Sequence, residues 1–278
     1  MAPHNVRWGI MGKRTLAQQQ SMITNDILGN FYSHWLDCKW YVLRQSLFYP
    51  RLPQQKRNTQ LNRICVKTVF VRDLLRDPDV RGASDVSHTV VAVASSSSKS
   101  RAEDFISDTG IPAPCAAYES YGELVADPNV DVIYVATPHS HHFQNVMLAF
   151  EAGKHVLCEK AFTVNAAQAK ILCETAKTKN LFLMEAVWTR YFPLSVQIRE
   201  LIQNGTLGEV LRVLADNSFG DDMEEKWGTE HRMVNKDLAG GALLDCKFSC
   251  LNLMHISTLH LMGSMLLSFS AHGEVSPH

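Results

Sequence analysis

The sequence has no marked excess of charge of either sign, no paired cysteine motif and no long apolar run. Its 27 basic and 28 acidic residues give a net charge of −1, so the overall charge gives no reason to expect a nucleic acid or an acidic membrane as partner. The seven cysteines are odd in number and include no C-x-x-C pair, which favours a reducing compartment over a disulfide framework. We therefore expect a cytoplasmic protein that binds neither nucleic acid nor membrane.

Signals for export or membrane insertion are also missing. The first residues contain no apolar stretch after a basic start, which predicts no secretory signal. Residues 251–270 are apolar, but Asn252, His255 and His260 interrupt them well below the roughly 18 continuous apolar residues of a membrane span. A hydrophobic content of 46% with 20% charged residues is typical of a globular chain, here of one large domain or two ordinary ones.

Two segments differ in composition from the rest of the chain. Residues 13–69 carry nine basic against two acidic residues, a net of +7, and contain a single glycine. From Cys246 to the end, only Lys247 and Glu274 are charged, while histidine and methionine are frequent. A basic, aromatic insert could be a nucleic-acid arm, but residues 13–69 show no RNA-binding, zinc-finger or heptad motif.

Outside these segments, strand-like and helix-like stretches alternate. The expected strands are residues 6–10, 88–94, 115–118, 132–136, 155–158 and 181–184. The expected helices are residues 70–77, 98–108, 120–126, 142–152, 165–179 and 194–203, and a further strand is expected over 209–215. The alternation predicts an α/β fold with a doubly wound parallel sheet, in which ligands bind beyond the carboxyl ends of the strands. The first strand ends in the spacing Gly9-x-x-Gly12, which is typical of a tight turn, so both glycines are candidates for cofactor binding.

The end of the second expected strand bears on the choice between NAD and NADP. An acidic residue there would bind the ribose 2′-hydroxyl and would repel a 2′-phosphate. The sequence instead has four serines at 95–98, Ser96 among them, followed by Lys99 and Arg101, with no acid before Glu103. Hydroxyl groups and two cations favour NADP, and a serine-rich loop with solvated charges is the alternative.

The next strand is followed by a turn rich in histidine. Its residues are Thr137, Pro138, His139, His141 and His142. The histidine spacing, without a nearby acid, is poor for zinc, so we expect no metal site. We expect this turn to lie against the nicotinamide ribose, with Thr137, Pro138, His139 and His142 as cofactor-binding residues.

The last two strands also end in polar motifs. Glu159 and Lys160 follow one strand, and a partly desolvated lysine beside an acid can act as general acid or base, or can orient a substrate hydroxyl. A Glu-Lys pair at a strand end is otherwise a surface pair. Trp188 and Arg190 follow the other strand, where the guanidinium could meet a phosphate or a carboxamide. We name Lys160 as the catalytic candidate and all four residues as candidates for cofactor binding.

Taken together, these motifs resemble the glucose–fructose oxidoreductase/inositol dehydrogenase/MocA (Gfo/Idh/MocA) family, and within it the fungal NADP-dependent D-xylose 1-dehydrogenases and the dimeric dihydrodiol dehydrogenases. The resemblance rests on residues 6–12, 127–138, 153–162, 185–191 and 240–245, and it covers 1–12 and about 70–245. It implies a Rossmann NADP-binding domain over 1–186, with the anomalous insert at 13–69. It further implies the start of an incomplete α+β domain with an open antiparallel sheet over 187–245, followed by the anomalous tail 246–278.

The same resemblance implies the chemistry. The lysine of the family's Glu-Lys-Pro motif corresponds to Lys160, with Ala161 in place of proline, and Asp245 closes a motif at the substrate site. The implied reaction oxidises the C1 hydroxyl of D-xylose, or of a similar aldose, to a lactone with hydride transfer to NADP⁺. Oxidation of trans-1,2-dihydrobenzene-1,2-diol is the alternative within the family, and a homodimer is the implied assembly.

Two positions depart from the family's pattern. Arg14 stands where the phosphate turn has its middle glycine, although Ala17 keeps the register, and a side chain there would keep the pyrophosphate from the backbone. Ser249 stands where the family has a tyrosine that exchanges the proton. These departures support an alternative of a different class, a non-catalytic fragment or binding protein from a mis-spliced gene.

Both departures begin where the composition changes. The pairs Gly12-Lys13 and Cys246-Lys247 can each be encoded with the bases GTAAG, the common start of a eukaryotic intron. We therefore hypothesise that residues 13–69 and 246–278 are translated introns.

Overall fold

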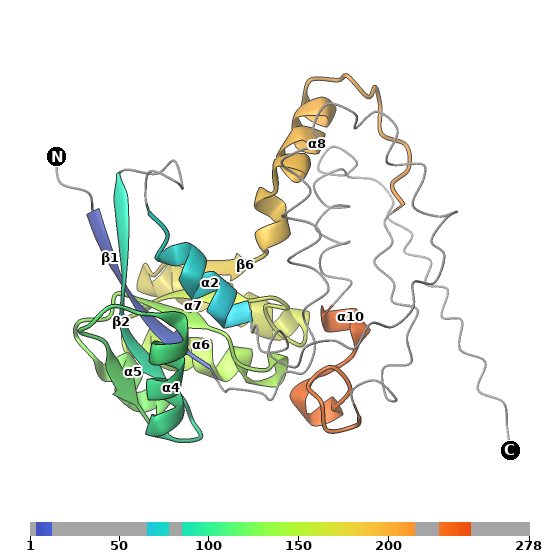
Figure 1. The fold of residues 1–278 in the computed structure, drawn as a ribbon. Coiled ribbons are helices and arrows are strands. Elements are labelled where there is room, and N and C mark those ends of the chain that lie inside the picture. The colour runs from blue at the N-terminus through green and yellow to red at the C-terminus, as the bar shows by residue number, and fades with distance from the viewer. Residues whose placement is uncertain (1–3, 13–65, 78–84, 215–227, 246–278) are drawn as a thin grey trace, which may run out of the picture. The chain divides into compact units, whose positions relative to one another are not determined.

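The computed structural model describes residues 4–12, 66–77, 85–214 and 228–245 (Figure 1). The chain divides into two units, Met1–Ala186 with Asp222–Gly241, and Val187–Asp221 with Ala242–His278. The first unit thus joins residues from both sides of the domain boundary predicted after residue 186, and that boundary stays a prediction. Most of the anomalous insert and the whole tail, with Arg14 and Ser249, lie outside the described residues.

Six parallel strands form one sheet in the first unit, in the order β3-β2-β1-β4-β5-β6. Their bounds are β1 His4–Met11, β2 Val86–Ala94, β3 Ala116–Tyr118, β4 Val132–Val135, β5 His155–Glu159 and β6 Leu183–Ala186. From β1 to β3 the successive strands are added on one side of β1, and from β4 to β6 they are added on its other side. The boundary between β1 and β4 is the topological switch point, where such sheets bind dinucleotides. The predicted doubly wound parallel sheet is confirmed.

Helices cover both faces of this sheet (Figure 1). On one face lie α2 (Val66–Leu74) and α4 (Lys99–Thr109), which contribute Val71 and Phe105 to the core. On the other face lie α5 (Tyr121–Ala126), α6 (His142–Glu151) and α7 (Ala166–Lys179), which contribute Leu124, Phe150 and Leu172. Both faces of the strands are thus buried, as expected for continuous apolar strands between helices.

Local signals set several helix ends. Ser120 and Glu123 form the predicted capping box of α5: the Ser120 hydroxyl accepts from the Glu123 N–H at 3.2 Å, and Glu123 Oε2 accepts from the Ser120 N–H at 3.1 Å. Gly110 ends α4 in the left-handed region at φ 69°, as a C-terminal glycine does. Helix α2 begins at Val66, four residues before the start at residue 70 that the sequence predicts.

The second unit contains η3 (Trp188–Tyr191), α8 (Pro193–Gln203) and α10 (Ala242–Asp245). The predicted helix at 194–203 is confirmed, but the predicted strand at 209–215 is wrong for its described part, since residues 209–214 are neither helix nor strand. A strand requires a hydrogen-bonded neighbour, and Leu211 and Leu214 are instead 81% and 85% exposed. Within the described residues, every helix is too short or too polar to span a membrane.

Candidate functional site

Gly9 lies inside β1 and not in the turn that follows it. A Cβ atom at this position would lie 2.9 Å from Cγ1 of Val130, closer than packed atoms allow. Gly9 therefore makes room for core side chains, and its contact with the cofactor stays a prediction. Gly12 is at the end of the strand, where its N–H donates to the Ala94 carbonyl at 3.3 Å.

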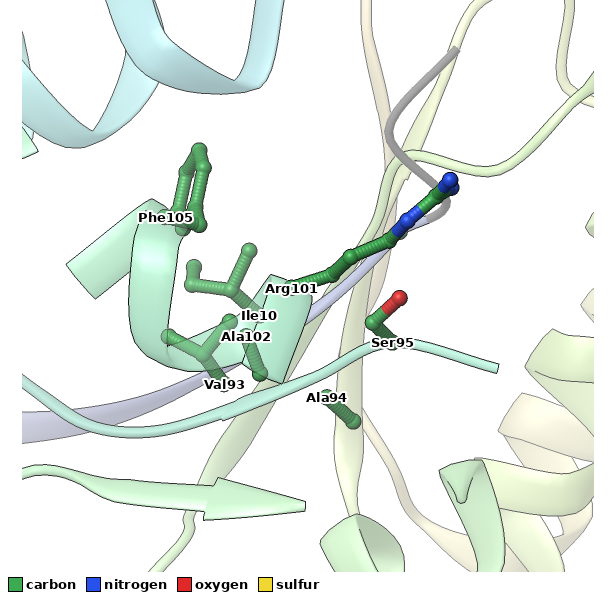
Figure 2. Close-up of a pocket in the computed structure, with 8 residues that line it drawn as sticks. Ile10, Val93, Ala94, Ser95, Arg101, Ala102 and Phe105 are labelled. Atoms are coloured by element: carbon green, nitrogen blue, oxygen red, sulfur yellow. The ribbon is translucent and has the colours of Figure 1, made fainter. Parts of the chain in front are cut away.

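A small pocket lies at the carboxyl ends of β1 and β2, against α4 (Figure 2). Its walls are mainly apolar, and it is lined by Ile10, Gly12, Val93, Ala94, Ser95, Arg101, Ala102 and Phe105. Figure 2 shows the Arg101 side chain extending from α4 toward the side on which the Ser95 hydroxyl lies. The pocket thus combines an apolar floor with one hydroxyl and one guanidinium at its rim.

The first turn of α4 continues this polar rim. Ser96, Lys99 and Arg101 are all exposed, and the first turn of the helix contains no acidic residue. The N-terminus of a helix carries partial positive charge and suits an anion. Hydroxyl groups, two cations and the helix terminus together fit a ribose 2′-phosphate, and the contacts of Ser96, Lys99 and Arg101 with that group stay predictions.

His142 is fully buried at the start of α6. Its Nδ1 lies 2.7 Å from the Ala161 carbonyl oxygen and its Nε2 lies 2.9 Å from the Thr137 carbonyl oxygen. Burial lowers the pKa of His142 to about 4, so the ring is neutral near pH 7. A neutral imidazole carries one N–H, so His142 donates to one of these two carbonyl oxygens. Its contact with the nicotinamide stays a prediction.

The other residues of this turn have separate partners. Asn145 donates to the Thr137 hydroxyl at 3.1 Å, and His139 Nδ1 lies 3.1 Å from the Ala239 carbonyl oxygen. His141 Nδ1 lies 2.9 Å from the Ser140 hydroxyl, and Pro138 precedes the short η2 helix (His139–His141). Throughout the described ranges, no three His, Cys, Asp or Glu side chains are grouped as metal ligands would be.

Lys160 directly follows β5 at the carboxyl edge of the sheet and is partly buried. Its N–H donates to Oε2 of Glu159 at 3.2 Å, and Oε1 of Glu159 accepts a hydrogen bond from the Tyr134 hydroxyl. Burial raises the pKa of Glu159, whereas the Tyr134 hydrogen bond and the positive charge of Lys160 lower it. Since parallel strands end at the same edge, Lys160 shares this edge with Gly12 and Thr137.

Glu185 of β6 is a site residue that the sequence reasoning did not single out. Its Oε1 accepts a hydrogen bond from the Phe162 N–H at 2.7 Å, and burial raises its pKa to about 7. Burial likewise raises the pKa of Cys158, which is inert as a thiol at neutral pH. An acidic residue inside an otherwise apolar strand was the signal that could have identified Glu185.

Trp188, Arg190 and Asp245 belong to the second unit. Trp188 is 50% exposed, with its ring edge-on to Phe192 at 5.2 Å between centroids. The Arg190 carbonyl accepts a hydrogen bond from Nη1 of Arg199 at 2.7 Å. Asp245 is the last residue of α10. Their contacts with cofactor and substrate stay predictions.

Several known proteins are similar to this chain in sequence or in fold. The chain is 62% identical over 184 residues to D-xylose 1-dehydrogenase (NADP(+)) of Hypocrea jecorina, covering 65% of this chain and 47% of that protein. It is 46% identical over 163 residues to the trans-1,2-dihydrobenzene-1,2-diol dehydrogenase of Homo sapiens, covering 59% and 46%. The crystal structure of an aldose-aldose oxidoreductase from Caulobacter crescentus, complexed with glycerol, matches with a TM-score of 0.53 and 27% identity, covering 62% of this chain and 50% of that one.

The chain spans about half the length of the curated relatives that it matches. Residues 73–187 match the model of the oxidoreductase family with an NAD-binding Rossmann fold, Gfo/Idh/MocA. This range contains the strand ends that carry Arg101, Thr137 and Lys160. Residues 73–187 are therefore similar to the Gfo/Idh/MocA oxidoreductase family.

Proposed function

We propose that the chain is the nicotinamide-binding part of an NADP-dependent dehydrogenase that oxidises the C1 hydroxyl of D-xylose, or of a similar aldose, to a lactone. The observation that carries the proposal is the partly buried Lys160 at the carboxyl edge of the sheet, beside Glu159. The 62% identity to a D-xylose 1-dehydrogenase (NADP(+)) supports the choice of substrate.

Different residues at the carboxyl edge of the sheet would bind different parts of NADP⁺. NADP⁺, when bound, supplies the acceptor for a hydride. Ser96, Lys99 and Arg101 would hold its 2′-phosphate, because their hydroxyl and cationic groups lie together at the start of α4. Gly12 and Thr137 would border it at the ends of β1 and β4.

Lys160 supplies the acid–base chemistry in this proposal. Its Nζ would accept the proton of the C1 hydroxyl, and its partial burial keeps that amine from bulk water. The hydrogen bond from the Lys160 N–H to Glu159 fixes the backbone from which the side chain starts. His142 holds the next residue through the Ala161 carbonyl, so the amine is presented from a rigid segment.

A trans-dihydrodiol is the second candidate substrate. The 46% identity to the human trans-1,2-dihydrobenzene-1,2-diol dehydrogenase supports it, and in both substrates the carbon that bears the reacting hydroxyl also carries the hydrogen that would leave as hydride. Parallel assays of NADPH formation with D-xylose and with the dihydrodiol separate the two. A higher kcat/KM for the dihydrodiol would replace the sugar as the substrate.

The first step of the experiment determines the sequence of the mature messenger RNA. Sequencing cDNA across residue 12 and across residue 245 decides whether residues 13–69 and 246–278 are encoded in the mature message. The encoded protein is then titrated with NADPH by fluorescence and assayed with D-xylose. A continuous message would defeat the intron hypothesis, and an encoded protein that forms no NADPH with any sugar would favour the non-catalytic alternative.

The proposal extends to location and assembly. Scattered cysteines favour the reducing cytoplasm, and Cys115, Cys158 and Cys173 are free thiols in the structure. We propose a homodimer because the sequence resembles the dimeric dihydrodiol dehydrogenases. Light scattering after size-exclusion chromatography tests the assembly, and a single monomeric peak at micromolar concentration would overturn it.

A further inference from the structure

The buried side chain of Tyr134 is connected to the proposed catalytic residue Lys160 through Glu159. Tyr134 of β4 is 0% exposed, and its ring stacks on Phe70 of α2 with 3.9 Å between centroids and 21° between planes. In the parallel pairing of β4 with β5, Tyr134 is aligned with Leu157. Side chains two residues apart in a strand share a face, so Glu159 follows Leu157 on the face that Tyr134 occupies.

The Tyr134 hydroxyl reaches this carboxyl group. It donates to Oε1 of Glu159, while Oε2 of Glu159 accepts the N–H of Lys160 at 3.2 Å. Each carboxyl oxygen thus has its own donor, one from β4 and one from the residue after β5. A carboxyl group held at both oxygens has one orientation, and two donors favour its ionised form.

Several charges act on this carboxyl group. Burial raises the pKa of Glu159, and the positive charges of Lys160 and Arg232 lower it. Glu185 of β6 and Cys158 of β5 are the other titratable groups nearby, and the Glu159 charge raises the pKa of both. The Tyr134 hydrogen bond is the largest of the effects that oppose burial, so it favours the ionised form of Glu159.

We propose that Tyr134 is a positioning residue for Lys160: through Glu159, its hydroxyl keeps a negative charge beside the lysine and fixes the strand end from which that side chain projects. The ring of Tyr134 serves packing, since its stack on Phe70 needs no hydroxyl. The hydroxyl is therefore the part of Tyr134 that serves the site. The use of this device in dehydrogenation rests on the proposed function, but the arrangement of the three side chains does not.

The test replaces Tyr134→Phe, which keeps the ring and removes the hydroxyl. Trace acetylation of the full chain with acetic anhydride at fixed pH, with peptide mass spectrometry, reports the reactive amine fraction of each lysine. We expect acetylation of Lys160 to rise about three- to tenfold, because a Glu159 carboxylate that loses a hydrogen bond is neutralised more readily and then attracts the lysine side chain less. The exposed Lys170 serves as internal reference.

The matched control is Tyr118→Phe. Tyr118 of β3 also donates to a carboxylate, Oδ2 of Asp127 at 3.2 Å, but this carboxylate is not the one that Lys160 contacts. Tyr118→Phe should leave acetylation of Lys160 unchanged. An equal rise in both variants would show a general loosening of the fold and would overturn the proposal.

Glu159→Gln provides a second route that does not depend on Tyr134. If Tyr134 acts through Glu159, Glu159→Gln alone raises acetylation of Lys160 and adding Tyr134→Phe changes it no further. Unchanged acetylation in Glu159→Gln, or additive effects in the double variant, would sink the idea. NADPH titration in parallel separates the two claims: an original chain without NADPH affinity fails the proposed function, while acetylation still decides the role of Tyr134.

Discussion

The N–H of Phe162 donates a 2.7 Å hydrogen bond to Oε1 of Glu185, so a carboxyl group from β6 holds the chain just after β5. The two strands are paired in register up to this point, with Cys158 opposite Glu185. This hydrogen bond adds a contact between β6 and the residues that follow β5, beyond the last backbone pairing of the two strands. It restrains the loop that begins with the proposed catalytic residue.

The two preceding residues are held in the same way. The Lys160 N–H donates to Glu159, and the Ala161 carbonyl oxygen lies 2.7 Å from Nδ1 of His142. Three successive backbone positions are thus each bound by a side chain, one from β5, one from α6 and one from β6. Such support is what a proton-transferring group needs if it is to meet its substrate in one geometry.

Loss of the Lys160 amine should abolish turnover but preserve the fold. Lys160→Met keeps the length of the side chain and removes the proton acceptor, so we expect kcat with D-xylose to fall by about 10²- to 10⁴-fold. Lys170→Met is the control, because Lys170 is exposed on α7 and only approaches Glu174 at 4.0 Å. Steady-state assay of NADPH formation measures both. A Lys160→Met enzyme within about threefold of the parent would remove Lys160 from the chemistry.

Arg101 should set the preference for NADP over NAD. Removing the guanidinium from the rim of the β1–β2 pocket takes a cation from the 2′-phosphate, so Arg101→Ala should weaken NADPH binding about tenfold or more. NADH lacks that phosphate, and its affinity should change little. Fluorescence titration with both cofactors measures the ratio. Arg76→Ala on α2 is the control, and equal losses for NADPH and NADH would contradict the assignment.

Gly9→Ala should destabilise the sheet. The added methyl group would lie 2.9 Å from Val130 and 3.0 Å from Ile133, so the core must shift, at a cost of about 1–3 kcal/mol in the free energy of unfolding. Gly122→Ala in α5 is the matched control, because the nearest atom there is 3.9 Å away and alanine favours a helix. Urea unfolding followed by circular dichroism compares them. Equal stability of the two variants would show that Gly9 is not tightly packed.

Glu185 should make stability depend on pH near neutrality. Burial raises its pKa from 4.5 to about 7, so the folded state favours the protonated carboxyl group. Its contribution to stability is then complete below pH 4.5 and is lost as the pH rises through about 7. Glu185→Gln removes this titration, so its free energy of unfolding should gain about 1–2 kcal/mol over the parent between about pH 5 and pH 8, after allowance for its partial exposure.

Urea unfolding at several pH values checks the effect of Glu185. The exposed Glu174→Gln on α7 is the control and should run parallel to the parent. A Glu185→Gln variant whose stability tracks the parent at every pH would mean that the carboxyl group titrates normally.

Local patterns in the sequence were sufficient for most elements of the first unit. β-branched runs predicted the buried strands β2 and β4, and the Ser120–Glu123 spacing predicted the start of α5, because these signals act over a few residues. The polar residues that follow β2 and β5, among them Ser95 and Lys160, were also visible, since a polar residue after an apolar strand contrasts with its neighbours.

Other features depended on contacts between distant residues. The strand expected at 209–215 is not formed in its described part, because a strand exists only with a hydrogen-bonded neighbour. The packing of Gly9 against Val130 and the place of His142 between the Ala161 and Thr137 carbonyl oxygens were not visible in the sequence. The residues that contact Gly9 and His142 lie in other segments of the chain, so short sequence patterns do not indicate them.

The sequence by itself determined the order of strands and helices along the chain and the residue types that follow each strand. The tertiary structure decided the neighbours: β1 beside β4, Tyr134 against Glu159, and Glu185 beneath the Phe162 amide. The physical reason is the sequence separation over which each interaction acts. Propensity and capping act within a few residues, whereas burial and the hydrogen bonds that satisfy buried polar groups depend on which distant side chains the fold brings into contact.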